Sequence, residues 1–148
     1  MEAVFKHILV PIDGSEPSLA AAHLAVRLIQ ACSVGRLIVL HVVDQLVLME
    51  LVRFGSRGAN EVQAELEQHG RQYLDLVSQE AEREGVAVQS QTRRGDPFEE
   101  IVAAANESGA DLIVMGHTGR RGTARVLIGS VTQRVLDYAP CPVLVTKG

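Results

Sequence analysis

The chain has 148 residues, 47% of them hydrophobic, and a formal net charge of -4. This length suits one core, so we expect a single domain over residues 1–148. No apolar run approaches the roughly 20 residues of a membrane-spanning helix, and the two cysteines have no metal-ligand or disulfide-scaffold spacing. The sequence therefore predicts a cytoplasmic protein without a membrane segment, and its acidic, aromatic-poor composition disfavours nucleic-acid binding.

The N-terminal half alternates strand and helix patterns. Residues 7–12 form an apolar, β-rich run, and residues 13–17 supply turn and helix-cap chemistry. Apolar residues at helical spacing over 19–29 predict a helix, which a glycine ends. Residues 37–43 are almost continuously apolar, which indicates a strand buried on both faces.

The middle of the chain contains a long connection and a long helix. Residues 45–59 are rich in apolar side chains and are expected to form a flap, a short helix or a partner surface. A helical pattern begins at Asn60 and ends near Gly85, and its apolar stripe, expected to face the core, consists of Val62, Leu66, Tyr73 and Val77. A short strand is predicted next, at residues 86–88.

The C-terminal half repeats the alternation. Asp96 is a candidate N-cap with Pro97 at the first helical position. Residues 111–115 predict a fourth strand, and a glycine-rich connection follows. A helix over 130–138 and a strand over 143–146 complete the pattern.

This order predicts an α/β fold: a single doubly wound, five-stranded parallel sheet in the order 3-2-1-4-5, with helices on both faces. Ligands of such sheets bind outside the carboxyl ends of the strands. Asp13, Val42 and Gly116 stand at those ends. A receiver domain is disfavoured, because residues 91–93 offer no aspartate at the expected end of strand three, and residues 13–18 do not suggest a flavodoxin phosphate loop.

The connection after the fourth strand carries the main functional signal. Glycine at 116 and 119 permits positive φ and close backbone approach to an anion. Gly129 and Ser130 open a helix whose N–H groups favour phosphate, and three arginines lie within 120–125.

The spacing Gly, two residues, Gly, nine residues, Gly, Ser resembles the nucleotide loop of the universal stress protein family, in its ATP-binding kind. Residues 8–15, 40–43, 110–116 and 139–145 carry the same resemblance along the whole chain. The resemblance implies a stress-response or signalling module whose ATP occupancy controls conformation or assembly.

The resemblance also implies a set of nucleotide-binding residues. Around the phosphates and ribose it places Gly116, Gly119, Gly129, Ser130 and Val131. Asp13 would lie near the phosphates or hold their Mg²⁺, and the backbone of Val42 would face the adenine. Apolar surface would come from Pro11, Ile12 and Met115. His117 and Arg121 belong to the same loop, although the spacing does not dictate their contacts.

Other interpretations remain open at this point. Asp13 could cap the first helix, which Ser15 could do as well, and His41 is expected to be a hydrogen-bonded core histidine. Cys141 is expected to pack at the start of a strand. The alternative functions are a slow ATP hydrolase or phosphotransferase and a nucleotide-free adaptor that binds proteins through residues 45–59.

The last strand predicts an assembly. In the order 3-2-1-4-5, residues 143–146 lie at a sheet edge with little protection against pairing. We expect a homodimer through this edge, which the resemblance also implies; the alternative is a monomer whose edge is covered.

Overall fold

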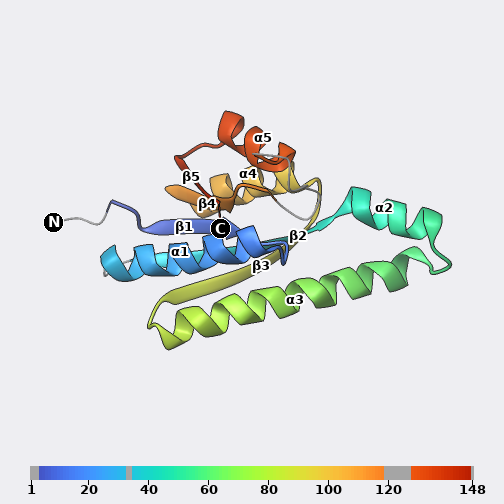
Figure 1. Cartoon of the computed structure of the whole chain (residues 1–148), viewed down its shortest axis with the longest axis horizontal. Helices are drawn as coiled ribbons and strands as arrows, with labels where there is room; N and C mark the ends of the chain where they lie inside the picture. The colour runs from blue at the N-terminus through green and yellow to red at the C-terminus, as the bar shows by residue number, and fades with distance from the viewer. Residues whose placement is uncertain (1–3, 33–34, 119–127, 148) are drawn as a thin grey trace.

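The computed structural model describes residues 4–32, 35–118 and 128–147. Helices and strands alternate along most of the chain (Figure 1). In chain order they are β1 (His7–Pro11), α1 (Glu16–Cys32), β2 (Arg36–Asp44), α2 (Gln45–Phe54), α3 (Ala59–Arg83), β3 (Ala87–Gly95), α4 (Pro97–Ser108), β4 (Leu112–Gly116), α5 (Ser130–Tyr138) and β5 (Val143–Thr146).

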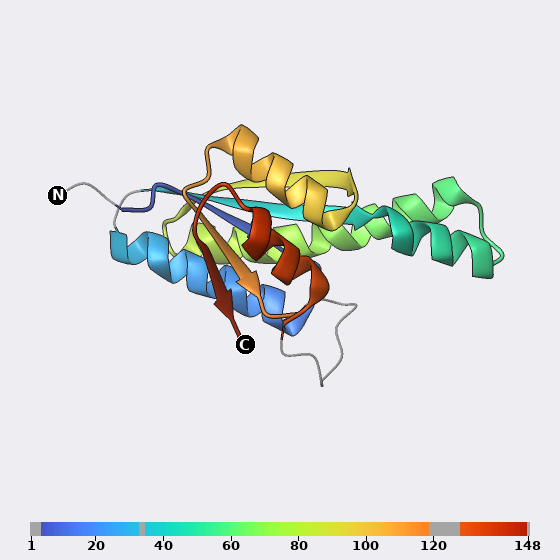
Figure 2. The same ribbon diagram turned by 90° about the horizontal axis from the view of Figure 1, so that it is seen from above.

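The five strands form one parallel sheet in the order β3-β2-β1-β4-β5, which confirms the predicted fold class. Helices α1 and α3 cover one face, and α4 and α5 cover the other (Figures 1 and 2). Alternation along β1 sends Ile8 and Val10 into one core and Leu9 into the other. Continuous apolarity in the central strands therefore does reflect burial on both faces.

Strand β3 is longer than predicted. It runs over nine residues and pairs with β2 from Arg36↔Ala87 to Asp44↔Gly95, whereas the sequence suggested only residues 86–88. Its outer residues are polar because β3 is an edge strand with much exposed surface, so no apolar pattern marks it.

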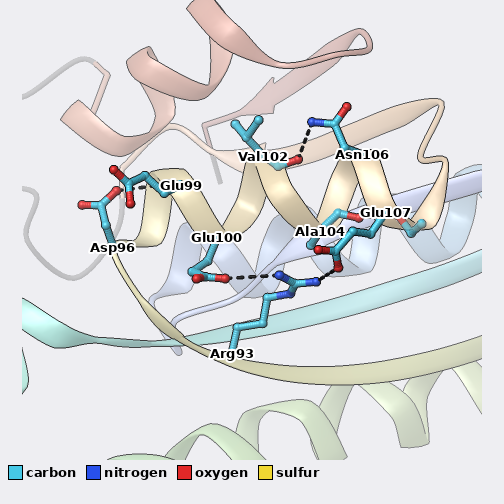
Figure 3. Close-up of polar contacts among 9 residues, drawn as sticks. Arg93, Asp96, Glu99, Glu100, Val102, Ala104, Asn106 and Glu107 are labelled. Atoms are coloured by element: carbon cyan, nitrogen blue, oxygen red, sulfur yellow. Dashed lines mark hydrogen bonds and ion pairs between the residues drawn. The ribbon is translucent and has the colours of Figure 1, made fainter.

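The end of β3 also changes one sequence argument. The residue after the strand is Asp96, so the absence of an aspartate at residues 91–93 does not argue against a receiver domain. The Asp96 carboxylate accepts the Glu99 N–H at 3.0 Å and caps α4 (Figure 3). Arg93 reaches from β3 to Glu100 and Glu107, which fixes α4 over the sheet (Figure 3).

The connection at 45–59 resolves into helix α2. The Asp44 side chain accepts the Leu46 N–H at 3.0 Å, which caps the helix. Together α2 and the first part of α3 project beyond the sheet as a helical arm (Figures 1 and 2). Leu46, Met49 and Phe54 are exposed on this arm.

Asp111 joins β1 and β4 at the amino ends of these strands. Its carboxylate accepts the N–H groups of Lys6 at 2.8 Å and His7 at 3.1 Å, which aligns β1 with β4.

In the described part of the chain, none of the helices is long and apolar enough to cross a membrane.

Helix α3 approaches the sheet most closely at Gly70. A Cβ atom there would lie 2.1 Å from Cδ2 of His41, a buried residue of β2. Since this distance is far below van der Waals contact, glycine is required for α3 to lie against β2.

We predict that Gly70→Ala lowers the free energy of unfolding by about 1–3 kcal/mol, because overpacking outweighs the better helix propensity of alanine. Urea unfolding measures the change. Ala64→Gly at an exposed position of the same helix is the control, and it should show that α3 otherwise prefers alanine. A Gly70→Ala protein as stable as the wild type would contradict the packing argument.

Candidate functional site

A cavity of about 610 Å³ opens at the carboxyl ends of β1, β2 and β4. Its volume lies within the range of small-molecule sites. The predicted site residues that line it are Pro11, Ile12, Asp13, Val42, Met115, Gly116, Gly129, Ser130 and Val131. Gly119 and Arg121 fall outside the described residues.

His117 is not part of the cavity wall among the described residues. Its backbone N–H donates to the Thr146 carbonyl at 2.9 Å, which links the end of β4 to β5. Its Nδ1 atom is buried and has no hydrogen-bond partner within the described part of the chain. The structure therefore places His117 beside the site without giving its ring a ligand-facing position.

The turn between β1 and α1 shapes the edge of the cavity. Asp13 Oδ1 accepts the Ser15 N–H at 2.9 Å, and Ser15 Oγ accepts the Ser18 N–H at 3.3 Å. Ser15 therefore caps α1, while Asp13 stabilises the turn and also lines the cavity. No group of three or more His, Cys, Asp or Glu side chains suited to a metal ion is found among the described residues.

The N-terminus of α5 borders the cavity, as the sequence predicted. Gly129 is the N-cap residue, and its carbonyl accepts the Gln133 N–H at 2.9 Å. The Gly129 N–H is already used, because it donates to the His117 carbonyl at 2.6 Å. The N–H groups of the first turn, Ser130 to Thr132, have no acceptor within the helix and carry its positive dipole end.

Gly116 is required for a reason that the sequence did not indicate. It is absent from the positive-φ glycines of the described chain, so conformational freedom is not what it supplies. A Cβ atom at this position would lie 2.6 Å from the backbone carbon of Pro17. Glycine thus lets the end of β4 lie directly against the start of α1.

Sequence analysis missed Thr132. This residue is 3% exposed, and its Oγ1 donates to the Gly116 carbonyl at 3.0 Å. The bond fixes the first turn of α5 to the end of β4. The available signal was weak, since a threonine in a helical first turn usually points to solvent.

Sequence analysis also missed the wall formed by helix α3. Leu66, His69 and Tyr73 line the cavity, and Val47 of α2 lies beside them. Leu66 and Tyr73 belong to the apolar stripe of α3, which predicted burial against the sheet. The Tyr73 ring in fact covers Gly14, where a Cβ atom would lie 2.3 Å from the phenol ring.

His41 is a core histidine, as expected. It is 8% exposed, and its Nδ1 lies 2.9 Å from the carbonyl oxygen of Ile12. Because a carbonyl only accepts hydrogen bonds, Nδ1 carries the proton and donates. The ring thereby joins the carboxyl ends of β1 and β2 at the cavity.

Cys141 lies at the end of the sheet away from the cavity, beside Asp111 at the amino end of β4. Burial raises the pKa of the Cys141 thiol, and the Asp111 carboxylate raises it further. The thiol therefore stays protonated near neutral pH and packs as a small apolar group, as the sequence suggested.

Comparison with known proteins identifies the family to which this architecture corresponds. The model of the universal stress protein family matches residues 5–147. The universal stress protein MJ0531 of Methanocaldococcus jannaschii is 39% identical over 147 residues, which covers 99% of this chain and 84% of the relative. YxiE of Bacillus subtilis is 32% identical and covers 97% of this chain and 100% of the relative.

Solved structures give the same result. The structure of MJ0577 from Methanocaldococcus jannaschii has a TM-score of 0.84 at 31% identity and covers 97% of this chain and 96% of its own. More distant structures include a universal stress protein in complex with cAMP and one from Archaeoglobus fulgidus in complex with dAMP. Their identities of 24% and 22%, with TM-scores of 0.61 and 0.68 and at least 95% of this chain covered, establish the shared fold.

We predict that Thr132→Val lowers the free energy of unfolding by about 1–2 kcal/mol, because the buried Gly116 carbonyl loses its hydrogen bond while the side-chain volume is kept. Chemical denaturation without ligand measures the loss. Ser130→Ala, in the same turn but exposed, is the control and should change stability by less than about 0.5 kcal/mol. Equal stabilities for the two variants would contradict the role given to Thr132.

Proposed function

Because this chain belongs to the universal stress protein family, we propose that its cavity binds an adenine nucleotide, ATP with Mg²⁺, as a stress-response or signalling module. The observation that carries the proposal is the position of the cavity. It lies at the carboxyl ends of the central strands and borders the first turn of α5. In doubly wound sheets this is where a phosphate-bearing ligand binds.

The phosphates are assigned to the N-terminus of α5. The first-turn N–H groups at Ser130 and Val131 point along the helix axis, and the dipole favours negative charge there. The Ser130 hydroxyl is exposed and lines the cavity, so it can donate to a phosphate oxygen. Gly119 lies outside the described residues and is assigned to the same phosphates on the loop pattern, which does not dictate a contact for Arg121.

The adenine is assigned to the β2 side of the cavity. Ile12 and Met115 provide buried apolar surface, and Val42 lines the cavity from the neighbouring strand. A largely apolar pocket with few polar anchors suits a flat heterocycle. Proteins of this fold have been solved in complex with cAMP and with dAMP, which supports an adenine nucleotide as the ligand class.

Asp13 is assigned to Mg²⁺. Its carboxylate lines the cavity, where it also accepts the Ser15 N–H. Magnesium sites in nucleotide-binding proteins commonly use one or two carboxylates together with substrate phosphates, so a single aspartate fits the ion. When bound, Mg²⁺ would neutralise phosphate charge that the described cavity walls do not.

We predict that ATP with Mg²⁺ raises the melting temperature of the protein, because a ligand that binds the folded state stabilises it. Gly129→Val should remove this shift, since a branched side chain would occupy the approach to the α5 N-terminus; even a Cβ atom lies 3.2 Å from Thr118 Cα. Differential scanning fluorimetry and calorimetric titration measure both effects.

Two further variants keep this test decisive. Ser130→Ala, which removes one hydroxyl at an exposed position, should weaken ATP binding about five- to tenfold without unfolding the protein. Ala64→Val on the outer face of α3 should leave ATP binding unchanged. A wild-type protein that binds no adenine nucleotide, or a folded Gly129→Val protein with unchanged affinity, would overturn the assignment.

We also propose a homodimer through β5. The sheet order places β5 at an edge, and Leu144 is 39% exposed there. The carbonyls of Pro142 and Thr146 accept N–H groups from the β4 side. Since alternate residues face opposite ways, Val145 directs its backbone N–H outward and can pair with a second copy.

We predict that Val145→Pro converts a wild-type dimer to a monomer in sedimentation equilibrium, because proline removes the outward donor and leaves the β4 ladder intact. Val145→Ala keeps the N–H and should remain dimeric. A wild-type protein that sediments as a monomer at high micromolar concentration, with and without ATP, would contradict the proposed dimer.

A further inference from the structure

Helix α3 forms one wall of the cavity, and none of its residues is among the proposed nucleotide contacts. Leu66, His69 and Tyr73 lie three and four residues apart, so they share one face of the helix. This face looks into the same cavity as the first turn of α5. Whatever ligand fills the cavity from end to end therefore meets side chains of α3.

The position of this wall is fixed by tight packing. The Tyr73 ring lies directly over Gly14, and the His41 ring fills the space beside Gly70. The rings of His41 and Tyr73 lie edge to face with their centroids 6.1 Å apart. His69 precedes Gly70 in the helix, so its backbone is held beside the end of β2.

The α3 wall and the α5 N-terminus lie at opposite ends of the cavity. Helix α3 packs on β2 and β3, whereas α5 packs on β5 and α4. The sheet order places β1 and β4 between these two groups. With the phosphates at α5, the part of the nucleotide that faces α3 is the nucleoside.

His69 is the side chain on this wall that is suited to polar recognition. It is exposed and lines the cavity, and within the described part of the chain its imidazole makes no hydrogen bond or ion pair. By contrast, Asp13 and Asp44 each accept a backbone N–H in their own turns. A neutral imidazole offers one donor and one acceptor, which matches a ribose hydroxyl or a base edge.

We propose that His69 hydrogen-bonds the nucleoside of the bound nucleotide and is a specificity-determining residue of the site. This inference rests on the proposed nucleotide-binding function. It implies that α3 helps to distinguish a nucleotide from a polyphosphate that lacks a nucleoside, whereas the α5 end recognises phosphate in both.

The test compares ADP with inorganic tripolyphosphate by calorimetric titration. His69→Phe keeps a flat ring but removes both nitrogen atoms, and it should weaken ADP binding about five- to tenfold, the effect of one lost hydrogen bond. Binding of tripolyphosphate should stay within about twofold. His69→Gln restores a donor and an acceptor and should recover most of the ADP affinity.

A matched control and an optical reporter complete the experiment. His23→Phe removes an exposed histidine of α1 that pairs with Glu80 outside the cavity, and it should leave both affinities unchanged. The chain contains two tyrosines and no tryptophan, so Tyr138→Phe leaves Tyr73 as the emitting side chain. Tyr73 fluorescence should change on ADP binding, and the titration should give the same Kd as calorimetry. It should not change on tripolyphosphate binding.

The outcomes separate this inference from the proposed function. If the wild type binds ADP but His69→Phe binds it as tightly, the inference is wrong and nucleotide binding stands. Equal losses of ADP and tripolyphosphate affinity would place His69 at the phosphates and also overturn it. If the wild type binds no adenine nucleotide, the proposed function fails and the inference fails with it.

Discussion

The cavity depends on one buried hydrogen bond, from His41 Nδ1 to the carbonyl oxygen of Ile12 at 2.9 Å. Ile12 is the residue that follows β1. Without the His41 donor, the Ile12 carbonyl would lose a buried hydrogen-bond partner at a cost of about 1–3 kcal/mol. The same ring lies against Gly70 and Tyr73, so β1, β2 and α3 keep one arrangement. Asp13 is the next residue after Ile12, so the same hydrogen bond also positions the turn that contains Asp13.

The two ends of the cavity are built on different principles. Under the proposed function, phosphate recognition at α5 comes from backbone N–H groups, whose direction is set by helix geometry and by the Thr132 bond to β4. At α3, recognition must come from side chains, because the backbone of a helix interior is already paired. If both proposals hold, the α5 end binds any phosphate, whereas the α3 end selects among ligands through the side chain at position 69.

This difference explains what the sequence could and could not predict. Gly129 was identifiable because a helix start after a glycine-rich loop has a local pattern, and the central strands were identifiable from their apolar runs. Strand β3 was missed over most of its length because an exposed edge strand carries polar residues. Tyr73 was placed in the core stripe, since its contact with Gly14 joins residues 59 positions apart and becomes visible only after α3 has docked.

Under the proposed function, a structural role and a ligand role share the side chain of Asp13. A carboxylate has about four acceptor sites, so the bond from the Ser15 N–H does not by itself exclude a cation. The described residues, however, offer no cluster of three metal-binding side chains. One carboxylate alone binds Mg²⁺ weakly, because the ion keeps its waters unless phosphate oxygens join the coordination. Under the proposed function, metal and nucleotide therefore bind as one complex, and the metal strengthens nucleotide affinity without being a permanent part of the fold.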